Sequence, residues 1–337
     1  MVNVHFLFCF EPAVNEKSGR KILAGRDRRA GDGFNARMNV PLPALPLADA
    51  PLASSPFTLT RPAGGSSRRE APVIFASPHS GREYPAAFVA AARLDRLGLR
   101  RSEDSFVDEL FEDAPAHGAP LLAATFPRAF CDPNREPWEL DPAMFAETLP
   151  SWVNTGSARV SAGLGTIARI VASGESIYRE KLAFAEAERR VREYWQPYHD
   201  CLAGLIAETR ERHGACLLID CHSMPTHGCI GRGGGVDFVL GDVFATTCAP
   251  RITRLVEEVL SGLGYTVRRN DPYAGGFITR HYGRPRENMH ALQIEIARPL
   301  YMNEARIEHG PRFAAVRADI RTLIGALTAQ AGALLRS

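Results

Sequence analysis

The 337-residue chain contains no run of apolar residues that approaches the roughly 20 needed to cross a bilayer. Its apolar start, "VNVHFLFCF", has no basic region before it and is followed by "EPAVNEKSGRK" instead of a small-residue cleavage site. We therefore expect no membrane partner and no signal peptide.

The chain also has no excess of charge of either sign. Its 40 Lys and Arg residues are scattered among 38 Asp and Glu residues, which leaves a formal net charge of +2. A protein that binds a polyanion usually gathers basic residues on one surface. The balance therefore argues against a nucleic acid partner.

Cysteine pairs are missing too. The seven cysteines are an odd number and form neither CxxC pairs nor the spacings of a zinc ribbon. We interpret them as reduced thiols, which predicts a cytoplasmic location.

The first 65 residues lack sustained periodicity of either the helical or the strand kind and are rich in Pro, Gly, Ala and Arg. We expect residues 1–65 to form a loosely ordered arm and residues 66–337 to form a single catalytic domain. Met38 opens a plausible chain of its own, so a start there instead of at Met1 is an alternative for residues 1–37. The mass of the mature protein would test it.

Beyond residue 70, strand-like apolar runs alternate with helical patterns, which is typical of an α/β sheet covered by helices. Strands are expected within 71–81, 119–134, 215–225, 265–270 and 289–298. Helices are expected within 102–118, 178–214, 251–264 and 304–335.

Two of these helices have specific predicted boundaries. Ser102 is the expected N-cap of the helix over 102–118, and Gly118 is expected to close it. Pro197 interrupts the pattern over 178–214, which predicts two helices or one kinked helix.

Two of the expected strands end in histidine. Ligands of α/β sheets bind beyond the carboxyl ends of the strands, and both "VIFASPHSG" and "LLIDCHSM" place a histidine there, His79 and His222. Two imidazoles and a carboxylate are a usual ligand set for catalytic zinc. Asp104 or Asp108 could supply the carboxylate. A Cys221 nucleophile is a weaker alternative, because adjacent side chains of a strand point to opposite faces.

A third strand carries a carboxylate. Gln293 and Glu295 interrupt the otherwise apolar run "ALQIEIARP", and a buried carboxylate is costly unless it is paired or bound. Glu295 is therefore the candidate general base, while an ion pair with Arg298 or Arg128 is the structural alternative.

Six sequence blocks between Val73 and Glu304 resemble those of the N-formylglutamate amidohydrolase family, also called formylglutamate deformylases. They are "SPHSGREYP", "PRAFCDPNREPWELD", "YWQPYHDCL", "IDCHSMP", "GGFITRHYGRP" and "LQIEIARPLYMNE". The resemblance implies one α/β domain with a mixed, mostly parallel sheet, similar to the zinc carboxypeptidases and aspartoacylase. It also implies hydrolysis of N-formyl-L-glutamate to formate and L-glutamate, with Zn²⁺ or another divalent metal, in histidine degradation.

The resemblance further implies an order of site residues: metal ligands His79, Asp104 and His222, and the base Glu295. Carboxypeptidases place their acidic ligand three residues after the first histidine, where this chain has Arg82. Glu83 follows it, but the nearby Pro85 disfavours a helix that would join Glu83 to His79. Asp104 is therefore preferred over both Asp108 and Glu83.

The basic residues take the remaining implied roles. Arg128 is expected to stabilise the oxyanion, and Asn134 with Arg135 to hold the α-carboxylate, since arginine suits bidentate carboxylate binding. Arg280, after the "YAGGFIT" segment, is expected to bind the side-chain carboxylate. Gly275 and Gly276 in that segment fit either a mobile lid or a tight turn.

Two further functions stay open from the sequence. One is a related zinc hydrolase that acts on another N-acyl amino acid or a short peptide. The other is a binding protein that has lost turnover. All three functions predict a small-molecule partner, and the sequence leaves the oligomeric state open.

Overall fold

The computed structural model describes residues 55–63, 70–226, 230–231 and 234–335. Residues 1–54, with most of the expected arm and with Met38, lie outside these ranges. Within them, β1 (Phe57–Thr60) pairs antiparallel with β3 (Leu121–Ala124). The sheet therefore begins before the boundary that we expected near residue 65.

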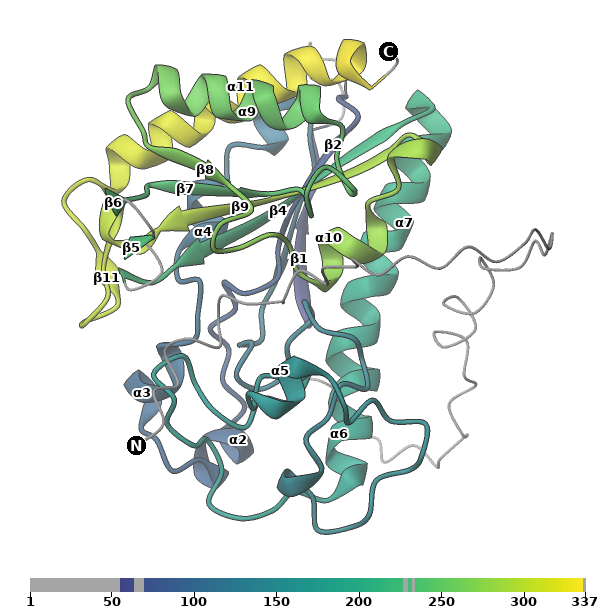
Figure 1. Cartoon of the computed structure of the whole chain (residues 1–337), viewed down its shortest axis with the longest axis vertical. Helices are drawn as coiled ribbons and strands as arrows, with labels where there is room; N and C mark the ends of the chain where they lie inside the picture. The colour runs from purple at the N-terminus through teal and green to yellow at the C-terminus, as the bar shows by residue number, and fades with distance from the viewer. Residues whose placement is uncertain (1–54, 64–69, 227–229, 232–233, 336–337) are drawn as a thin grey trace, which may run out of the picture. The chain divides into compact units, whose positions relative to one another are not determined.

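A seven-stranded sheet forms the centre of the fold, in the order β1-β3-β2-β4-β9-β7-β8 (Figure 1). Four neighbouring pairs are parallel, and the pairs β1–β3 and β7–β9 are antiparallel, which confirms the mixed, mostly parallel α/β class. The other strands are β2 (Val73–Ser77), β4 (Cys216–Met224), β7 (Phe238–Gly241), β8 (Val267–Arg269) and β9 (Met289–Ala297). The expected strands are confirmed, and β1 and β7 were not anticipated.

Smaller elements surround the sheet. The helices are α2 (Ala86–Ala91), α3 (Arg96–Arg100), α4 (Val107–Leu110), α5 (Ala158–Ser161), α9 (Pro250–Gly262), α10 (Phe277–Tyr282) and α11 (Phe313–Leu334). Single turns form η2 (Pro115–His117), η3 (Pro142–Met144), η5 (Pro285–Glu287) and η6 (Arg298–Leu300). Two short hairpins pair β5 (Ile230–Gly231) with β6 (Gly234–Gly235) and β10 (Met302–Asn303) with β11 (Glu308–His309). None of the helices in the described ranges has both the length and the apolar character of a membrane span.

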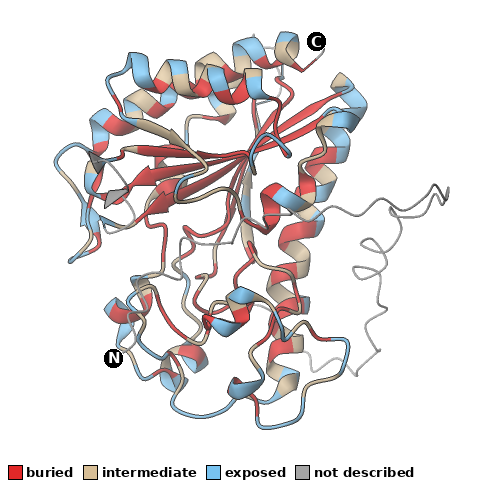
Figure 2. Ribbon diagram, viewed as in Figure 1, coloured by how far each residue is buried: buried red, intermediate tan, exposed pale blue. Residues whose placement is uncertain are grey.

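The two-residue period of the strands divides the core into two layers, one on each face of the sheet. On β4, Leu217, Ile219 and Cys221 pack in the layer beneath α9 and α11, whereas Cys216 and Leu218 pack in the opposite layer. Figures 1 and 2 show α9 and α11 side by side over one face, with their outer surfaces exposed and the central strands buried. His222 has the parity of the second layer, so it faces away from Cys221.

The helix expected over 102–118 does not form as one element, and this prediction was wrong. Only α4 and the single turn η2 are helical, and Phe106 ahead of α4 has a left-handed φ of 67°. Ser102 caps nothing; its Oγ accepts a hydrogen bond from the Ala172 amide. The cause lies at Asp104, whose amide donates to the carbonyl of His79 and draws this segment to the end of β2 as a loop.

The pattern over 178–214 becomes one continuous helix, with α6 (Phe184–Arg190), the π turn η4 (Val191–Trp195) and α7 (Gln196–His213). The Gln196 amide donates to the Val191 carbonyl, five residues back. A proline inside an α-helix clashes with the carbonyl four residues before it and lacks its own N–H. The wider π turn directly before Pro197 accommodates both defects without ending the helix.

His199 on α7 makes stability depend on pH. The ring is buried, with Nε2 2.7 Å from the Pro133 carbonyl and Nδ1 2.9 Å from the Tyr282 hydroxyl. Burial, together with the His281 charge, lowers the pKa of His199 to about 3 against the opposing Pro133 hydrogen bond. A histidine of the unfolded chain has a pKa of about 6.5. Between pH 3 and pH 6.5 the unfolded chain therefore binds a proton at His199 that the folded protein does not, and the unfolding free energy falls as the pH falls below about 6.5.

We expect His199→Gln to remove this dependence. Between pH 6.5 and pH 5 the difference in unfolding free energy between wild type and variant should shrink by about 2 kcal/mol, at about 1.4 kcal/mol per pH unit. Urea unfolding of both proteins at the two pH values measures it. A difference that stays constant would show that His199 does not carry the linkage.

Candidate active site

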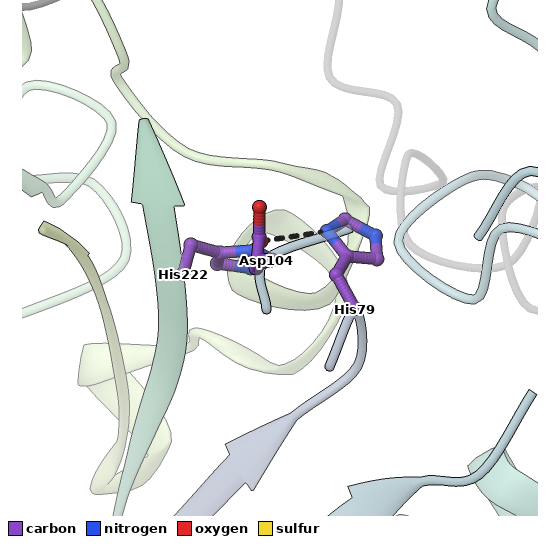
Figure 3. Close-up of side chains that lie close together, drawn as sticks. All are labelled: His79, Asp104 and His222. Atoms are coloured by element: carbon purple, nitrogen blue, oxygen red, sulfur yellow. Dashed lines mark hydrogen bonds and ion pairs between the residues drawn. The ribbon is translucent and has the colours of Figure 1, made fainter. Parts of the chain in front are cut away.

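Two histidines and one aspartate converge at the carboxyl ends of β2 and β4. Ligand atoms of His79, Asp104 and His222 all lie within 4.8 Å of one another, and all three residues are buried. Asp104 Oδ2 lies 3.2 Å from His79 Nδ1 and 3.0 Å from His222 Nδ1, between the two rings (Figure 3). The imidazole centroids are 4.7 Å apart.

The sheet register brings these residues together. β2 and β4 are parallel, with Ala76 opposite Asp220, so the segment just beyond β2 lies beside His222. The loop before α4 then places Asp104 between the rings through the backbone bond to His79. The convergence that the strand ends predicted is confirmed for His79 and His222.

Carboxylates also contact the outer nitrogens of the two rings. His79 Nε2 lies 2.7 Å from Asp132 Oδ1, and His222 Nε2 lies 2.9 Å from Asp220 Oδ1. A carboxylate on one ring nitrogen keeps the proton there and leaves the other nitrogen free to bind a metal. This arrangement favours Nδ1 of His79 as a metal ligand, and Nδ1 of His222 faces the same oxygen of Asp104.

The second oxygen of Asp104 is held by other groups. Asp104 Oδ1 lies 3.0 Å from Arg298 Nη2 and 3.3 Å from Ser223 Oγ, while Arg298 Nε donates to Ser223 Oγ. These contacts leave Oδ2 directed at the imidazoles. Arg298, the alternative ion-pair partner for Glu295 from the sequence, pairs instead with Asp104.

Burial and the neighbouring charged groups shift the pKa values of His222 and Asp104. Burial lowers the pKa of His222, but Asp220 and Asp104 outweigh it and raise that pKa well above its ordinary value. Burial acts to raise the pKa of Asp104, yet hydrogen bonds from His222 and His79 hold it well below its usual range. Two imidazole nitrogens and one carboxylate oxygen, each supported by a further polar group, fit a divalent metal such as zinc.

Glu295 lies beside this cluster on β9, directly opposite His222 in the parallel pair. Its Oε1 accepts a hydrogen bond of 2.8 Å from Gln293 Nε2, and Gln293 Oε1 in turn accepts from the Gly276 amide. Burial raises the pKa of Glu295 to about 7, with Asp104 adding to the rise and His222 opposing it. A carboxylate with a pKa near neutrality suits transfer of a proton in both directions.

Arg128 is anchored on the carboxylate that contacts His79. Its Nε and Nη2 donate to Asp132 Oδ2 at 3.2 and 2.8 Å. Burial lowers its pKa, but the charges of Asp132, Asp104 and Glu295 outweigh burial and raise it. The Asp132 carboxylate thus positions both His79 and Arg128, and the guanidinium of Arg128 interacts electrostatically with Glu295.

Asn134 and Arg135 follow Asp132 in the chain. Asn134 Nδ2 lies 3.0 Å from His222 Nε2, and Asn134 Oδ1 accepts from the Ile278 amide. Arg135 donates to the carbonyls of Leu164 and Asn134, and its Nη2 is 3.9 Å from Asp132 Oδ2. Burial lowers the pKa of Arg135 to about 10, so the guanidinium stays charged at neutral pH.

Gly276 packs directly against Asn134. A Cβ at this position would lie 2.4 Å from both terminal atoms of the Asn134 side chain, although the backbone φ of −92° suits any residue. The close approach and the Gly276–Gln293 hydrogen bond support the tight-turn interpretation over a mobile lid.

Gly276→Ala should therefore displace Asn134 without straining the backbone. We expect a loss of about 1–3 kcal/mol in unfolding free energy from overpacking and a higher KM for the substrate. Thermal unfolding and steady-state kinetics measure the two effects. Gly204→Ala in α7 is the matched control, because its Cβ meets no atom within 4 Å and it should raise stability slightly. Equal kinetics in both variants would contradict the role of Asn134.

Some of the predicted residues lie apart from the cluster. Arg280 is exposed on α10, whereas the preceding residues of that helix contact the site through Asn134 and Asp220. Asp108 pairs with Arg82 at 2.9 Å and is not part of the His–Asp–His group. Of the three acids considered, Asp104 is the one that meets both histidines.

The sequence interpretation gave no supporting role to several polar residues of the site. These are Asp132, Asp220, Ser223, Gln293 and Arg298. For Asp220 a signal existed, since it precedes His222 by two residues and so shares its face of β4. The bond between Arg298 and Asp104 spans 194 positions of the chain, and no spacing rule predicts it.

Comparisons with known proteins identify the family of this chain. A family model described as N-formylglutamate amidohydrolase matches residues 71–302. The N-formylglutamate deformylase of Pseudomonas aeruginosa is 32% identical over 269 residues, which cover 78% of this chain and 94% of that protein. A second protein of that name from Pseudomonas putida is 30% identical and matches 69% of this chain and 82% of its own length. The crystal structure of an N-formylglutamate amidohydrolase from Ralstonia eutropha is similar with a TM-score of 0.77 and 40% identity, covering 84% of this chain and 99% of that one.

Proposed function

The chain belongs to the N-formylglutamate amidohydrolase family, and on that premise we propose that it hydrolyses N-formyl-L-glutamate to formate and L-glutamate. The observation that carries the proposal is the buried His79–Asp104–His222 group with Glu295 on the adjacent strand. All four residues lie within the part of the chain that the family model matches.

His79, Asp104 and His222 would hold the metal, through Nδ1 of the two rings and Oδ2 of the carboxylate. A divalent ion bound there would supply a Lewis acid for the formyl carbonyl and would make water more acidic. Asp132 contacts Nε2 of His79, Asp220 and Asn134 lie beside Nε2 of His222, and Arg298 holds Asp104 through its other oxygen.

Glu295 is the proposed general base and acid. Gln293 donates to Oε1, so Oε2 would take the proton from the attacking water and deliver it to the departing glutamate nitrogen. The raised pKa of about 7 means that proton uptake and release both cost little near neutral pH.

Arg128 would stabilise the negative charge that develops on the formyl oxygen, held in place by its two bonds to Asp132. Asn134 and Arg135 would bind the α-carboxylate of the substrate. Arg280 stays our proposal for the side-chain carboxylate, which requires its exposed guanidinium to turn toward the substrate.

Formate release from a panel of N-acyl amino acids tests the function. We expect zinc-loaded protein to prefer N-formyl-L-glutamate over N-formyl-L-glutamine, N-formyl-L-methionine and N-acetyl-L-glutamate. Preference for another compound would support the related hydrolase instead, and bound zinc without turnover of any compound would support the binding protein.

We also propose that the enzyme works in the cytoplasm, in histidine degradation. The five cysteines in the described part of the chain are free thiols, as expected in a reducing compartment.

A further inference from the structure

The segment 131–135, which we call the site loop, carries three of the proposed functional side chains. Asp132 contacts His79 and Arg128, Asn134 contacts His222, and Arg135 donates to the Leu164 and Asn134 carbonyls. The loop has no regular secondary structure, so its backbone needs partners from elsewhere to stay in one conformation.

Three of these partners are side chains of the continuous helix formed by α6, η4 and α7. Trp195 Nε1 donates to the Arg135 carbonyl at 3.0 Å, and His199 Nε2 lies 2.7 Å from the Pro133 carbonyl. Just before the loop, Arg190 Nη1 donates to the Phe130 carbonyl at 2.9 Å. Three side chains of the continuous helix therefore contact three backbone carbonyls within 130–135, those of Phe130, Pro133 and Arg135.

The π turn places these donors on one side of the helix. At about 100° per residue, residues four apart, such as Trp195 and His199, lie about 40° apart around an α-helix, but residues five apart, such as Arg190 and Trp195, lie about 140° apart. In a π turn the hydrogen bond reaches back five residues instead of four. Arg190 directly precedes such a turn and Trp195 is its last residue, so the two lie around the helix much as residues four apart do in an α-helix.

The contacts are buried within the core. All three donors are buried, and the Trp195 and His199 rings stack with centroids 3.9 Å apart. Phe277 packs against both rings, and Tyr282 bonds to His199 Nδ1. Because water cannot replace these donors, losing one leaves a buried carbonyl without a partner.

We propose that Trp195 and His199 are positioning residues, which act through the carbonyls of Arg135 and Pro133 to fix Asn134 and Arg135 for the substrate carboxylate. The inference rests on the proposed function and deepens it. It also gives the π turn a structural role, because in a regular α-helix Arg190 would not face the same loop as Trp195 and His199.

Single substitutions separate positioning from simple packing. Trp195→Phe keeps a ring but removes the indole N–H. His199→Leu removes both ring nitrogens, and His199→Gln restores an N–H where Nε2 lies. Tyr198→Phe is the matched control, because Tyr198 is equally buried on the same helix and its hydroxyl has no hydrogen-bond partner among the described residues.

We expect Trp195→Phe and His199→Leu to lower kcat/KM for N-formyl-L-glutamate by about 10- to 100-fold, mainly through KM, since a displacement of about 1 Å in a binding group has effects of this size. His199→Gln should recover most of the loss, and Tyr198→Phe should match wild type. If all four variants keep the wild-type KM while only the melting temperature changes, the positioning role is overturned.

Hydrogen exchange gives a readout that does not depend on the substrate. The Asp132 amide donates to the Thr166 carbonyl and the Asn134 amide to Asp132 Oδ1, so we expect both amides to exchange slowly while the site loop is held. We expect faster exchange of peptides over 131–135 in Trp195→Phe and His199→Leu, but not in Tyr198→Phe. A wild-type protein without deformylase activity would contradict the proposed function alone, whereas unchanged exchange in both variants would contradict this inference.

Discussion

Replacing Glu295 with glutamine is expected to lower kcat for formate release by about 10²- to 10⁴-fold, the usual contribution of a positioned general base. The amide has nearly the shape of the carboxylate but cannot take a proton from water. Glu295 is buried, and its Oε1 accepts from Gln293 Nε2, a hydrogen bond that the amide oxygen of a glutamine can also accept. The variant should therefore fold and retain zinc, because the ligand atoms belong to other residues.

Zinc content by mass spectrometry and formate release, measured on the same preparation, check this prediction. Glu308→Gln is the control, since this exposed glutamate on β11 pairs with Arg306 and should leave turnover unchanged. A Glu295→Gln enzyme with wild-type kcat would show that another group carries the proton. Loss of zinc along with activity would show that Glu295 supports the metal instead.

The strand ends were predictable because three short-range rules agree there. A buried strand in a parallel sheet is continuously apolar, so the polar residues at His79, His222 and Glu295 stood out against their neighbours. The carboxyl ends of parallel strands meet at one edge of the sheet, which brought histidines about 140 positions apart into contact.

Residues outside regular strands followed other constraints. The acids and the Ser102 signal favoured a helix over 102–118, but the tertiary bond between the Asp104 amide and the His79 carbonyl overrode that local preference. The π turn was missed for a similar reason. Pro197 indicates an irregularity in the helix. Whether the helix ends, kinks or widens there depends on what its side chains contact, which here are carbonyls in and next to the site loop.

Supporting residues were the hardest to predict, because their roles depend on partners far away in the chain. Arg298 was considered as a partner of Glu295, three residues before it, whereas the fold directs it across β4 to Asp104. Asp132 likewise gains its importance from His79, 53 positions earlier. Such pairs follow from the topology of the sheet and leave no trace in local spacing.

Removing the imidazole of His222 is expected to abolish stoichiometric zinc binding. Substitution of a residue that merely orients a metal ligand costs about 10- to 100-fold in metal affinity, so loss of a ligand itself should cost more than that. His222→Gln is the sharper test than alanine, because it keeps most of the volume beside Asp104, Asp220 and Glu295. It also leaves Asp104 and Asp220 buried without their shared partner, which should lower the unfolding free energy by about 3–5 kcal/mol.

A buried histidine outside the site separates metal loss from general destabilisation. His290 lies on the neighbouring strand β9, is similarly buried, and bonds to the Ala249 amide through Nδ1. His290→Gln should lose some stability yet bind one zinc per chain with wild-type affinity in a chelator competition, and formate release should persist. Full zinc occupancy in His222→Gln would instead remove His222 from the ligand set, and with it the convergence of two strand-end imidazoles on one ion that the proposed chemistry requires.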